Sequence, residues 1–153
     1  MDYLQGNHAK PEGCIFSDVV ATPDADETKL ILHRGQCCFI VLNLYPYNNG
    51  HLMIVPFEHA DSIESLPAKT LTEMITLSQR CLAILRQAYN PQAFNIGINI
   101  GSAAGAGVPG HVHLHIVPRW SGDTNFMSAL ANTRVIPEYV EQTYERLRNL
   151  WTQ

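Results

Sequence analysis

Three features are missing from this sequence, and each absence excludes a class of function. No apolar run is long enough to cross a membrane, and the N-terminus lacks the basic and then apolar pattern of a signal peptide. No block rich in lysine and arginine is present and the net charge is −4, which argues against a general nucleic-acid binder. The four cysteines lack the spacing of a disulfide framework. We therefore expect a reduced protein of the cytoplasm.

The length and composition are those of one globular domain. The 153 residues are enough to bury a core, and 46% of them are hydrophobic while 16% are charged. No internal repeat or shift in composition divides the chain. We expect a single domain over residues 1–153, with a loose N-terminal arm over residues 1–13 and an amphipathic C-terminal helix over residues 137–151.

The order of apolar patterns indicates the fold class. Short apolar runs bounded by turn residues predict strands over residues 28–33, 37–43, 51–55 and 93–100. Apolar side chains at helical spacing predict a long helix from Pro67 to about Tyr89. Strands and helices do not alternate as βαβ units, so we expect an α+β fold with a largely antiparallel sheet.

The most informative segment is residues 110–118, which read GHVHLHIVP. Successive side chains of a strand point to opposite faces, so His111, His113 and His115 share one face while the intervening apolar side chains face the core. Stability alone favours apolar or threonine side chains on the histidine face, and imidazole is the side chain that titrates near neutral pH. The pattern therefore favours chemistry over a purely structural role.

Two kinds of chemistry are open to three histidines in this register. One metal ion held by all three is disfavoured, because residues i and i+4 of a strand lie roughly 13 Å apart and zinc holds its ligands at about 2 Å. A neutral imidazole can instead attack phosphorus and form a covalent phosphoramidate. The flanking imidazoles can donate to phosphoryl oxygens, and N–H groups of the glycine-rich loop over residues 101–110 can form an anion site. We therefore favour nucleophilic catalysis.

The pattern His-φ-His-φ-His-φ-φ, in which φ is apolar, resembles the signature of the histidine triad (HIT) superfamily, and residues 111–117 match every position. The resemblance extends from about Thr28 to Arg119. The stretches NLYPYNNGHLM, AGAGVPG and PRWSGDTNFM are similar to the branch of bacterial diadenosine tetraphosphate phosphorylases. This resemblance implies a HIT-like fold and a nucleotidyl transferase that acts on dinucleoside polyphosphates through an AMP–histidine intermediate.

The resemblance also implies roles for individual residues. His113 corresponds to the nucleophile, His111 and His115 would position it and hold phosphoryl oxygens, and His51 is a further histidine of the site. Asn43 is expected to bind ribose hydroxyls. The remaining residues expected to bind the nucleotide are Asn99, Gly105, Ala106, Gly107 and Arg119. Tyr45 and Tyr47 either border a nucleobase or cover the edge of the core.

Many HIT proteins also carry a structural zinc site that begins with an N-terminal Cys-x-x-Cys. Here Cys14 is followed by Ser17 in place of the second cysteine, and His59 stands where those relatives have a ligand. Serine is a poor zinc ligand beside thiolate. We therefore expect no structural zinc and no required cofactor, although a divalent cation can accompany the polyphosphate.

The sequence leaves the acceptor open between inorganic phosphate and water, and the resemblance favours phosphate. Two alternatives to the phosphorylase are a HIT hydrolase of dinucleoside polyphosphates or nucleoside phosphoramidates, and a nucleotide-binding regulatory protein with little turnover. The expected partners are the nucleotide substrate and a second copy of the chain in a homodimer. Nucleic acid and membrane are not expected partners.

Overall fold

The computed structural model describes residues 13–123 and 138–152. They form a five-stranded antiparallel sheet with strand order β1-β2-β3-β5-β4. The strands are β1 (Ile31–Arg34), β2 (Cys38–Leu42), β3 (Leu52–Pro56), β4 (Ala93–Ile98) and β5 (Leu114–Arg119). The helices are α1 (Ile15–Val20), α2 (Ala68–Tyr89) and α4 (Val140–Trp151), with 3-10 turns η1 (Pro23–Ala25), η2 (Ile63–Ser65) and η3 (Ser102–Ala104). The expected α+β fold is confirmed.

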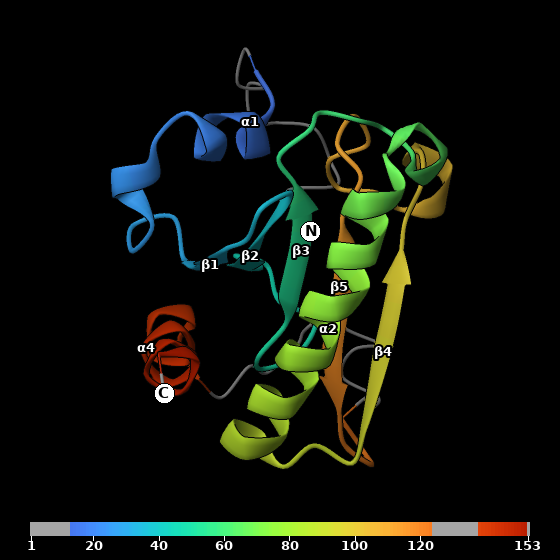
Figure 1. Ribbon diagram of the computed structural model, residues 1–153. Helices are drawn as coiled ribbons and strands as arrows, with labels where there is room; N and C mark the ends of the chain where they lie inside the picture. The colour runs from blue at the N-terminus through green and yellow to red at the C-terminus, as the bar shows by residue number, and fades with distance from the viewer. Residues whose placement is uncertain (1–12, 124–137, 153) are drawn as a thin grey trace.

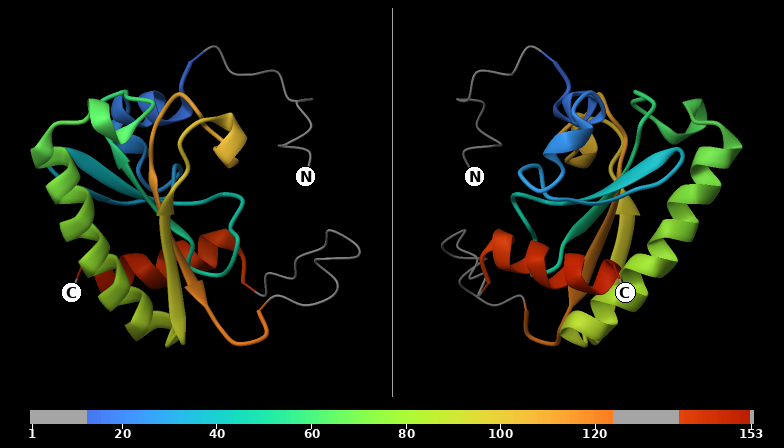
Figure 2. Two further views of the ribbon diagram at one scale, coloured as in Figure 1. Left: turned by 90° about the vertical axis from the view of Figure 1, so that its right-hand side faces the viewer. Right: turned by 60° about the vertical axis from the view of Figure 1, so that its left-hand side comes forward.

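Two apolar clusters lie on opposite faces of the sheet. On one face, α2 and α4 bury the larger cluster, and α2 packs against strands β3, β5 and β2 (Figures 1 and 2). On the other face, α1 packs Phe16 and Val19 against a smaller cluster contributed by β1, β2 and β3. No helix among the described residues is long and apolar enough to cross a membrane.

Helix α2 follows the prediction within one residue at its start. Pro67 precedes the first helical residue, and the helix ends at Asn90, which adopts a left-handed conformation with φ 46° and donates its N–H to the Arg86 carbonyl at 3.0 Å. Asparagine tolerates this conformation better than most residues. The apolar spacing of the sequence therefore located the helix, but not every apolar position lies on its buried face: Met74 and Leu85 are buried, whereas Ile75 is 58% exposed.

The hairpin between β1 and β2 is fastened to α2 by one carboxylate. Glu73 accepts hydrogen bonds from the N–H groups of Gln36 and Cys37, each at 2.8 Å. A Cβ atom at Gly35 would collide with the Glu73 carboxylate, so a larger residue there would displace this contact. This contact fixes the hairpin over the long helix.

Three strand boundaries differ from the sequence prediction by two residues or more, and one of them is the end of β4, which stops at Ile98 and not at residue 100. Strand β1 begins at Ile31 because residues 28–30 remain in a turn, in which Leu30 has a φ of 59°. Strand β5 begins at Leu114, so only His115 of the three histidines lies within it. The pairing with β3 stops there because β3 ends at Pro56, which has no N–H, and the N–H of Val112 bonds to the Ala60 carbonyl instead.

The C-terminal helix has its first described residue at Val140, and Tyr144, Leu147 and Trp151 are buried on one side of it. Its predicted start at residue 137 and most of the predicted N-terminal arm lie outside the described residues.

Candidate active site

His113 is held as a neutral imidazole with one nitrogen available for attack. Its Nδ1 lies 2.8 Å from the backbone carbonyl oxygen of His111, which can only accept, so Nδ1 carries the proton and Nε2 the lone pair. The residue is 3% exposed, and burial lowers its pKa. The Phe16 ring packs edge-on against it with centroids 5.3 Å apart. His113 is therefore prepared to act as a nucleophile.

A chain of hydrogen bonds sets the proton on His115. The Tyr47 backbone N–H donates to Nδ1 of His51 at 3.0 Å, so the proton of the His51 ring is on Nε2. That Nε2–H lies 2.9 Å from Nδ1 of His115, which must accept. His115 therefore carries its own proton on Nε2 and can donate it to a phosphoryl oxygen. Burial and the neighbouring His113 lower the pKa of His115 to about 4, so the ring is neutral at pH 7.

His111 is the most enclosed of the triad and both of its ring nitrogens are used within the protein. Its Nε2–H donates to the Pro56 carbonyl at 2.9 Å, and its Nδ1 accepts from the Cys14 thiol at 3.2 Å. The sequence interpretation has this ring hold phosphoryl oxygens. In this arrangement its contribution to His113 comes through its backbone carbonyl.

Cys14, His59 and His111 form a group that could hold a metal ion. Each offers one ligand atom, and the three atoms lie within 4.8 Å of one another. The bond from His111 Nε2–H to a carbonyl leaves Nδ1 as the ligand atom, which is the usual support for a metal-bound histidine. Ser17 lies beside His59, with Oγ 3.3 Å from Nδ1. The group therefore fits a zinc ion through three strong ligands, with the fourth position of a closed structural site lacking a thiolate.

Asn43 and Tyr47 lie beside the histidine row. The Asn43 side-chain amide is 3.3 Å from Nδ1 of His51, and its oxygen accepts the Tyr45 N–H at 3.0 Å. The Tyr47 ring lies against His51 and His115, with centroids 4.8 Å and 6.1 Å apart, whereas Tyr45 is 64% exposed. Of the two tyrosines whose role the sequence left open, Tyr47 is the one described in contact with the site histidines.

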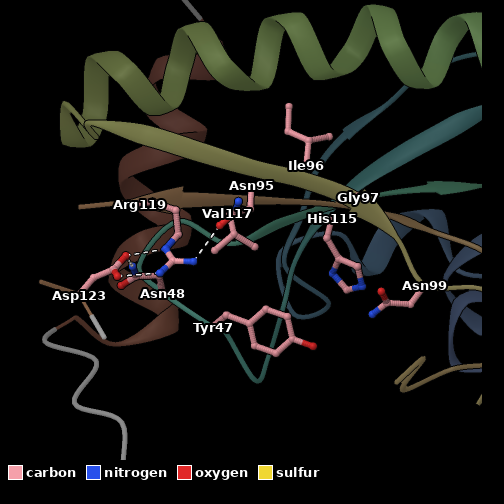
Figure 3. A pocket seen from close by; sticks show the side chains of 10 residues that line it. All are labelled: Tyr47, Asn48, Asn95, Ile96, Gly97, Asn99, His115, Val117, Arg119 and Asp123. Carbon is pink, nitrogen blue, oxygen red and sulfur yellow. Dashed lines mark hydrogen bonds and ion pairs between the residues drawn. The ribbon is translucent and has the colours of Figure 1, made fainter. Parts of the chain in front are cut away.

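A cavity of about 250 Å³ opens beside His115 on the histidine face of the sheet (Figure 3). Its lining comes from β4, β5 and the loops that follow β2, β4 and β5: Tyr47, Asn48, Asn95, Ile96, Gly97, Asn99, His115, Val117, Arg119 and Asp123. In Figure 3 the Ile96 side chain points away from the others, toward α2, and the Asn99 side chain lies beside His115. The structure thus places Asn99 beside His115.

Arg119 reaches this cavity as part of an ion pair. Its Nε and Nη2 donate to the two oxygens of Asp123 at 2.6 and 2.8 Å, and its Nη1 donates to Asn95 at 2.7 Å. The hydrogen bonds from Arg119 lower the pKa of Asp123 to about 2 and raise that of the guanidinium. The charge of Arg119 is therefore largely balanced before any ligand binds.

The C-terminal end of the glycine-rich loop, residues 101–110, is hydrogen-bonded to the histidine triad. The His111 N–H donates to the Val108 carbonyl at 3.2 Å, which connects the loop to the triad. Within the loop, the N–H groups of Gly105 and Ala106 donate to the carbonyls of Ser102 and Gly101 at 3.0 and 3.4 Å. These two amides are engaged in the turn itself.

Several residues of the site were not identified from the sequence as such. Phe16 comes from α1, 97 positions before His113, and nothing in the spacing indicates its contact with the ring. Cys14 was noted for the zinc motif alone, and its contact with His111 has no signal in the sequence. Asp123 follows Arg119 by four residues in a turn, a spacing that could have indicated the ion pair. Gly97 lies opposite His115 in the β4–β5 pairing, which the register of the two strands reveals.

The fold and the histidine row define a class of α+β proteins in which an antiparallel sheet carries a buried row of imidazoles on the face opposite its long helix. A sequence model described as the HIT domain matches residues 25–122, and the chain belongs to the HIT family.

Relatives and solved structures agree with this membership. The chain is 37% identical over 129 residues to the AP-4-A phosphorylase of Mycobacterium tuberculosis, an alignment that covers 84% of this chain and 66% of the relative. It is 31% identical over 93 residues to the bis(5'-nucleosyl)-tetraphosphatase [asymmetrical] of Schizosaccharomyces pombe, covering 61% and 50%. Its fold matches a Zn-bound histidine triad family protein from Mycobacterium smegmatis with a TM-score of 0.73 and 28% identity, over 92% and 94% of the two chains. The chain thus spans about two thirds of the phosphorylase and half of the tetraphosphatase.

Proposed function

We propose that this protein is a nucleotidyl transferase that acts on dinucleoside polyphosphates through a covalent AMP–histidine intermediate. The observation that carries the proposal is the protonation of His113, whose Nδ1–H donates to a carbonyl and whose Nε2 keeps a lone pair. The similarity to the AP-4-A phosphorylase supports diadenosine tetraphosphate as the substrate and inorganic phosphate as the acceptor.

The reaction proceeds in two displacements. Nε2 of His113 attacks the phosphorus that carries one adenosine, the bond to the bridging oxygen breaks, and ATP leaves with the electron pair. The nucleotidylated ring is positively charged, and the His111 carbonyl stabilises it through Nδ1–H. An oxygen of inorganic phosphate then attacks the same phosphorus, the P–N bond breaks, and ADP leaves. The Nε2–H of His115 donates to a non-bridging oxygen as charge develops there.

The binding roles follow from the same arrangement. We assign the ribose of the transferred nucleotide to Asn43, whose amide borders His51. Asn99, next to His115, is assigned to the phosphates together with the turn over residues 105–107. Arg119 is assigned to the distal part of the substrate. Because Asp123 balances its charge, Arg119 would orient the substrate through hydrogen bonds and would attract its negative charge only weakly.

A product assay tests the function and its rivals. The protein is incubated with diadenosine tetraphosphate, with and without inorganic phosphate, and the nucleotides are separated. ADP that forms only with phosphate supports the phosphorylase. AMP in both conditions would replace it with a hydrolase, the second candidate, which the relationship to the tetraphosphatase favours. Binding of AMP without any product would leave a regulatory binder and overturn the proposal.

We infer that the reaction needs no metal ion, because His113 and His115 supply the nucleophile and the donor from protein groups alone. A zinc ion, where present, would be held by Cys14, His59 and His111 and would fasten α1 to the triad. Such an ion would support the position of His111 without contacting the reacting phosphorus.

A homodimer that joins two sheets along β4 is the proposed assembly. Strand β4 lies at one edge of the sheet, and Ile96 is 47% exposed while Ile100, which follows the strand, is 43% exposed. An exposed edge with apolar side chains favours pairing with another strand. Light scattering of the wild type should give twice the chain mass, and Ile96→Lys should shift it toward the monomer.

A reducing compartment, the cytoplasm, is the proposed location. All four cysteines are free thiols, and burial raises the pKa of Cys38 and of Cys81 to about 12, so both remain protonated.

A further inference from the structure

The cavity beside His115 contains a glycine that the fold does not require. Gly97 lies within β4, and its backbone is not in the left-handed region that favours glycine. A Cβ atom built on it would meet nothing within 4 Å. Glycine inside a strand costs roughly 0.5–1 kcal/mol relative to alanine, and it often marks a place where a ligand approaches closely. The absence of a side chain here therefore points to function.

The position of Gly97 relative to the reacting groups is fixed by strand pairing. Gly97 lies directly opposite His115, and side chains at such paired positions stand about 5 Å apart. On the other side of His115 are His51 and then Asn43, to which the transferred nucleotide is assigned. Asn43 and Gly97 thus flank the His115 ring from opposite sides. A substrate bound by its transferred half at Asn43 extends its leaving half over Gly97.

The lining of this cavity matches the nucleoside end of a leaving nucleotide. The side-chain NH2 of Asn95 can bond ribose or base, because only its oxygen is used by Arg119. Asn99, whose side chain has no hydrogen-bond partner among the described residues, remains available for the phosphates beside His115. The Tyr47 ring forms one wall. The single guanidinium is already paired with Asp123, which makes the cavity a poor site for a bare polyphosphate. A volume of about 250 Å³ lies just below the range of roughly 300–1,000 Å³ usual for small-molecule sites, so the cavity has room for a part of the substrate and not for a whole dinucleoside polyphosphate.

Building on the proposed function, we propose that this cavity receives the nucleoside of the leaving nucleotide, and that Gly97 sets the specificity for substrates with a large leaving group by keeping the cavity floor open. A side chain at position 97 would occupy the space between His115 and the amides of Asn95 and Asn99. It would leave the transferred half of the substrate and the nucleophile untouched.

A graded series tests this proposal: Gly97→Ala, Gly97→Val and Gly97→Leu. Each variant is assayed with diadenosine tetraphosphate and with the p-nitrophenyl ester of AMP, which transfers the same group but has a small leaving group. We expect kcat/KM for the tetraphosphate to fall with side-chain size, by about 10-fold to 200-fold for valine and leucine, as for steric exclusion from a pocket. The value for the ester and the Kd for AMP should change less than about 3-fold.

Thermal unfolding distinguishes a specificity role of Gly97 from a structural one, because loss of a structurally required glycine would lower the unfolding temperature. Gly97→Ala should unfold at the same or a higher temperature than the wild type, because it removes chain entropy from the unfolded state and meets no clash. The matched control is Ile98→Val, which changes the same strand at a position that packs against the core cluster and should leave both substrates unaffected.

The outcomes separate this proposal from the one on which it rests. A wild-type protein that turns over neither substrate contradicts the proposed function. An active wild type whose Gly97 variants lose both substrates equally, or lose AMP affinity, shows that the glycine serves the fold or His115 and overturns the specificity role. Full activity of Gly97→Leu on the tetraphosphate also overturns it.

Discussion

Replacement of His51 tests whether the protein sets the tautomer of His115. In the wild type, the Tyr47 N–H fixes the proton of His51 on Nε2, and that proton fixes the acceptor nitrogen of His115. His51→Ala removes the donor. The His115 ring can then move its proton to Nδ1, which leaves an acceptor nitrogen facing the phosphoryl oxygens where a donor is needed.

The magnitude follows from the loss of one positioned donor. Mutation of a single donor to a developing oxyanion costs about 10²–10³ in kcat, which is about 2.7–4 kcal/mol. His115 keeps some of its correct tautomer without His51, so we expect the lower limit, about a 100-fold fall in kcat. KM should change less than about 3-fold, because His51 contacts the substrate only through His115.

Two further variants make the assay specific. His51→Gln places an amide N–H near the former Nε2 and should retain activity within about 10-fold of wild type, whereas His51→Asn is too short to reach His115 and should resemble alanine. Steady-state kinetics with diadenosine tetraphosphate measures each. The reasoning is refuted if His51→Ala keeps the wild-type kcat, or if glutamine is no better than asparagine in a protein that remains folded.

The remaining predictions concern zinc, the hairpin contact and pH. Ser17→Cys completes the Cys-x-x-Cys motif and should retain one zinc ion per chain through dialysis against a weak chelator, whereas the wild type should lose the ion. Elemental analysis measures the zinc content, and equal retention by the two proteins would contradict the role assigned to Ser17. Glu73→Ala should lower the urea unfolding free energy by about 1–2 kcal/mol, because two N–H groups lose a charged acceptor, and an unchanged value would show that water replaces it. His115 has a lower pKa in the folded state than in the unfolded state, so the folded state disfavours its protonation. Its neutral ring therefore adds fully to the free energy of unfolding above pH 6.5, and this stabilisation is lost as the pH falls toward about 4. After a reduction for its partial exposure, this stabilisation amounts to about 1–2 kcal/mol. In His115→Gln, the free energy of unfolding should therefore change less steeply with pH between 4 and 6.5. An unchanged slope would contradict the lowered pKa.

The sequence predicted the secondary structure where local chemistry decides it. The apolar spacing located α2 almost to the residue, and alternation identified the faces of β4 and of the triad segment. The errors had one local and one distant cause. Residues 28–30 were assigned to a strand, but hydrogen bonds to residues 25 and 27 keep them in a turn. Strand β5 starts late because Pro56, far away in the sequence, ends the neighbouring strand.

The site, like the fold, has features that the sequence could predict and features that it could not. Its reactive residues could be named from the triad and the resemblance, because identity and spacing carry that information. Their protonation could not, since it depends on the carbonyl of His111 and the amide of Tyr47, groups that every residue possesses. The role of Gly97 depends on the register between β4 and β5, which has no signal in either strand alone.

The central claim is that Nε2 of His113 bonds transiently to phosphorus. The direct test is to mix the protein with diadenosine tetraphosphate in the absence of inorganic phosphate, quench at alkaline pH, where phosphoramidates persist, and analyse the peptides by mass spectrometry. The account predicts one adenylyl group on His113, its removal as ADP when phosphate is added before the quench, and no adduct in His113→Ala. Efficient turnover by His113→Ala, or an adduct on another residue, would contradict it.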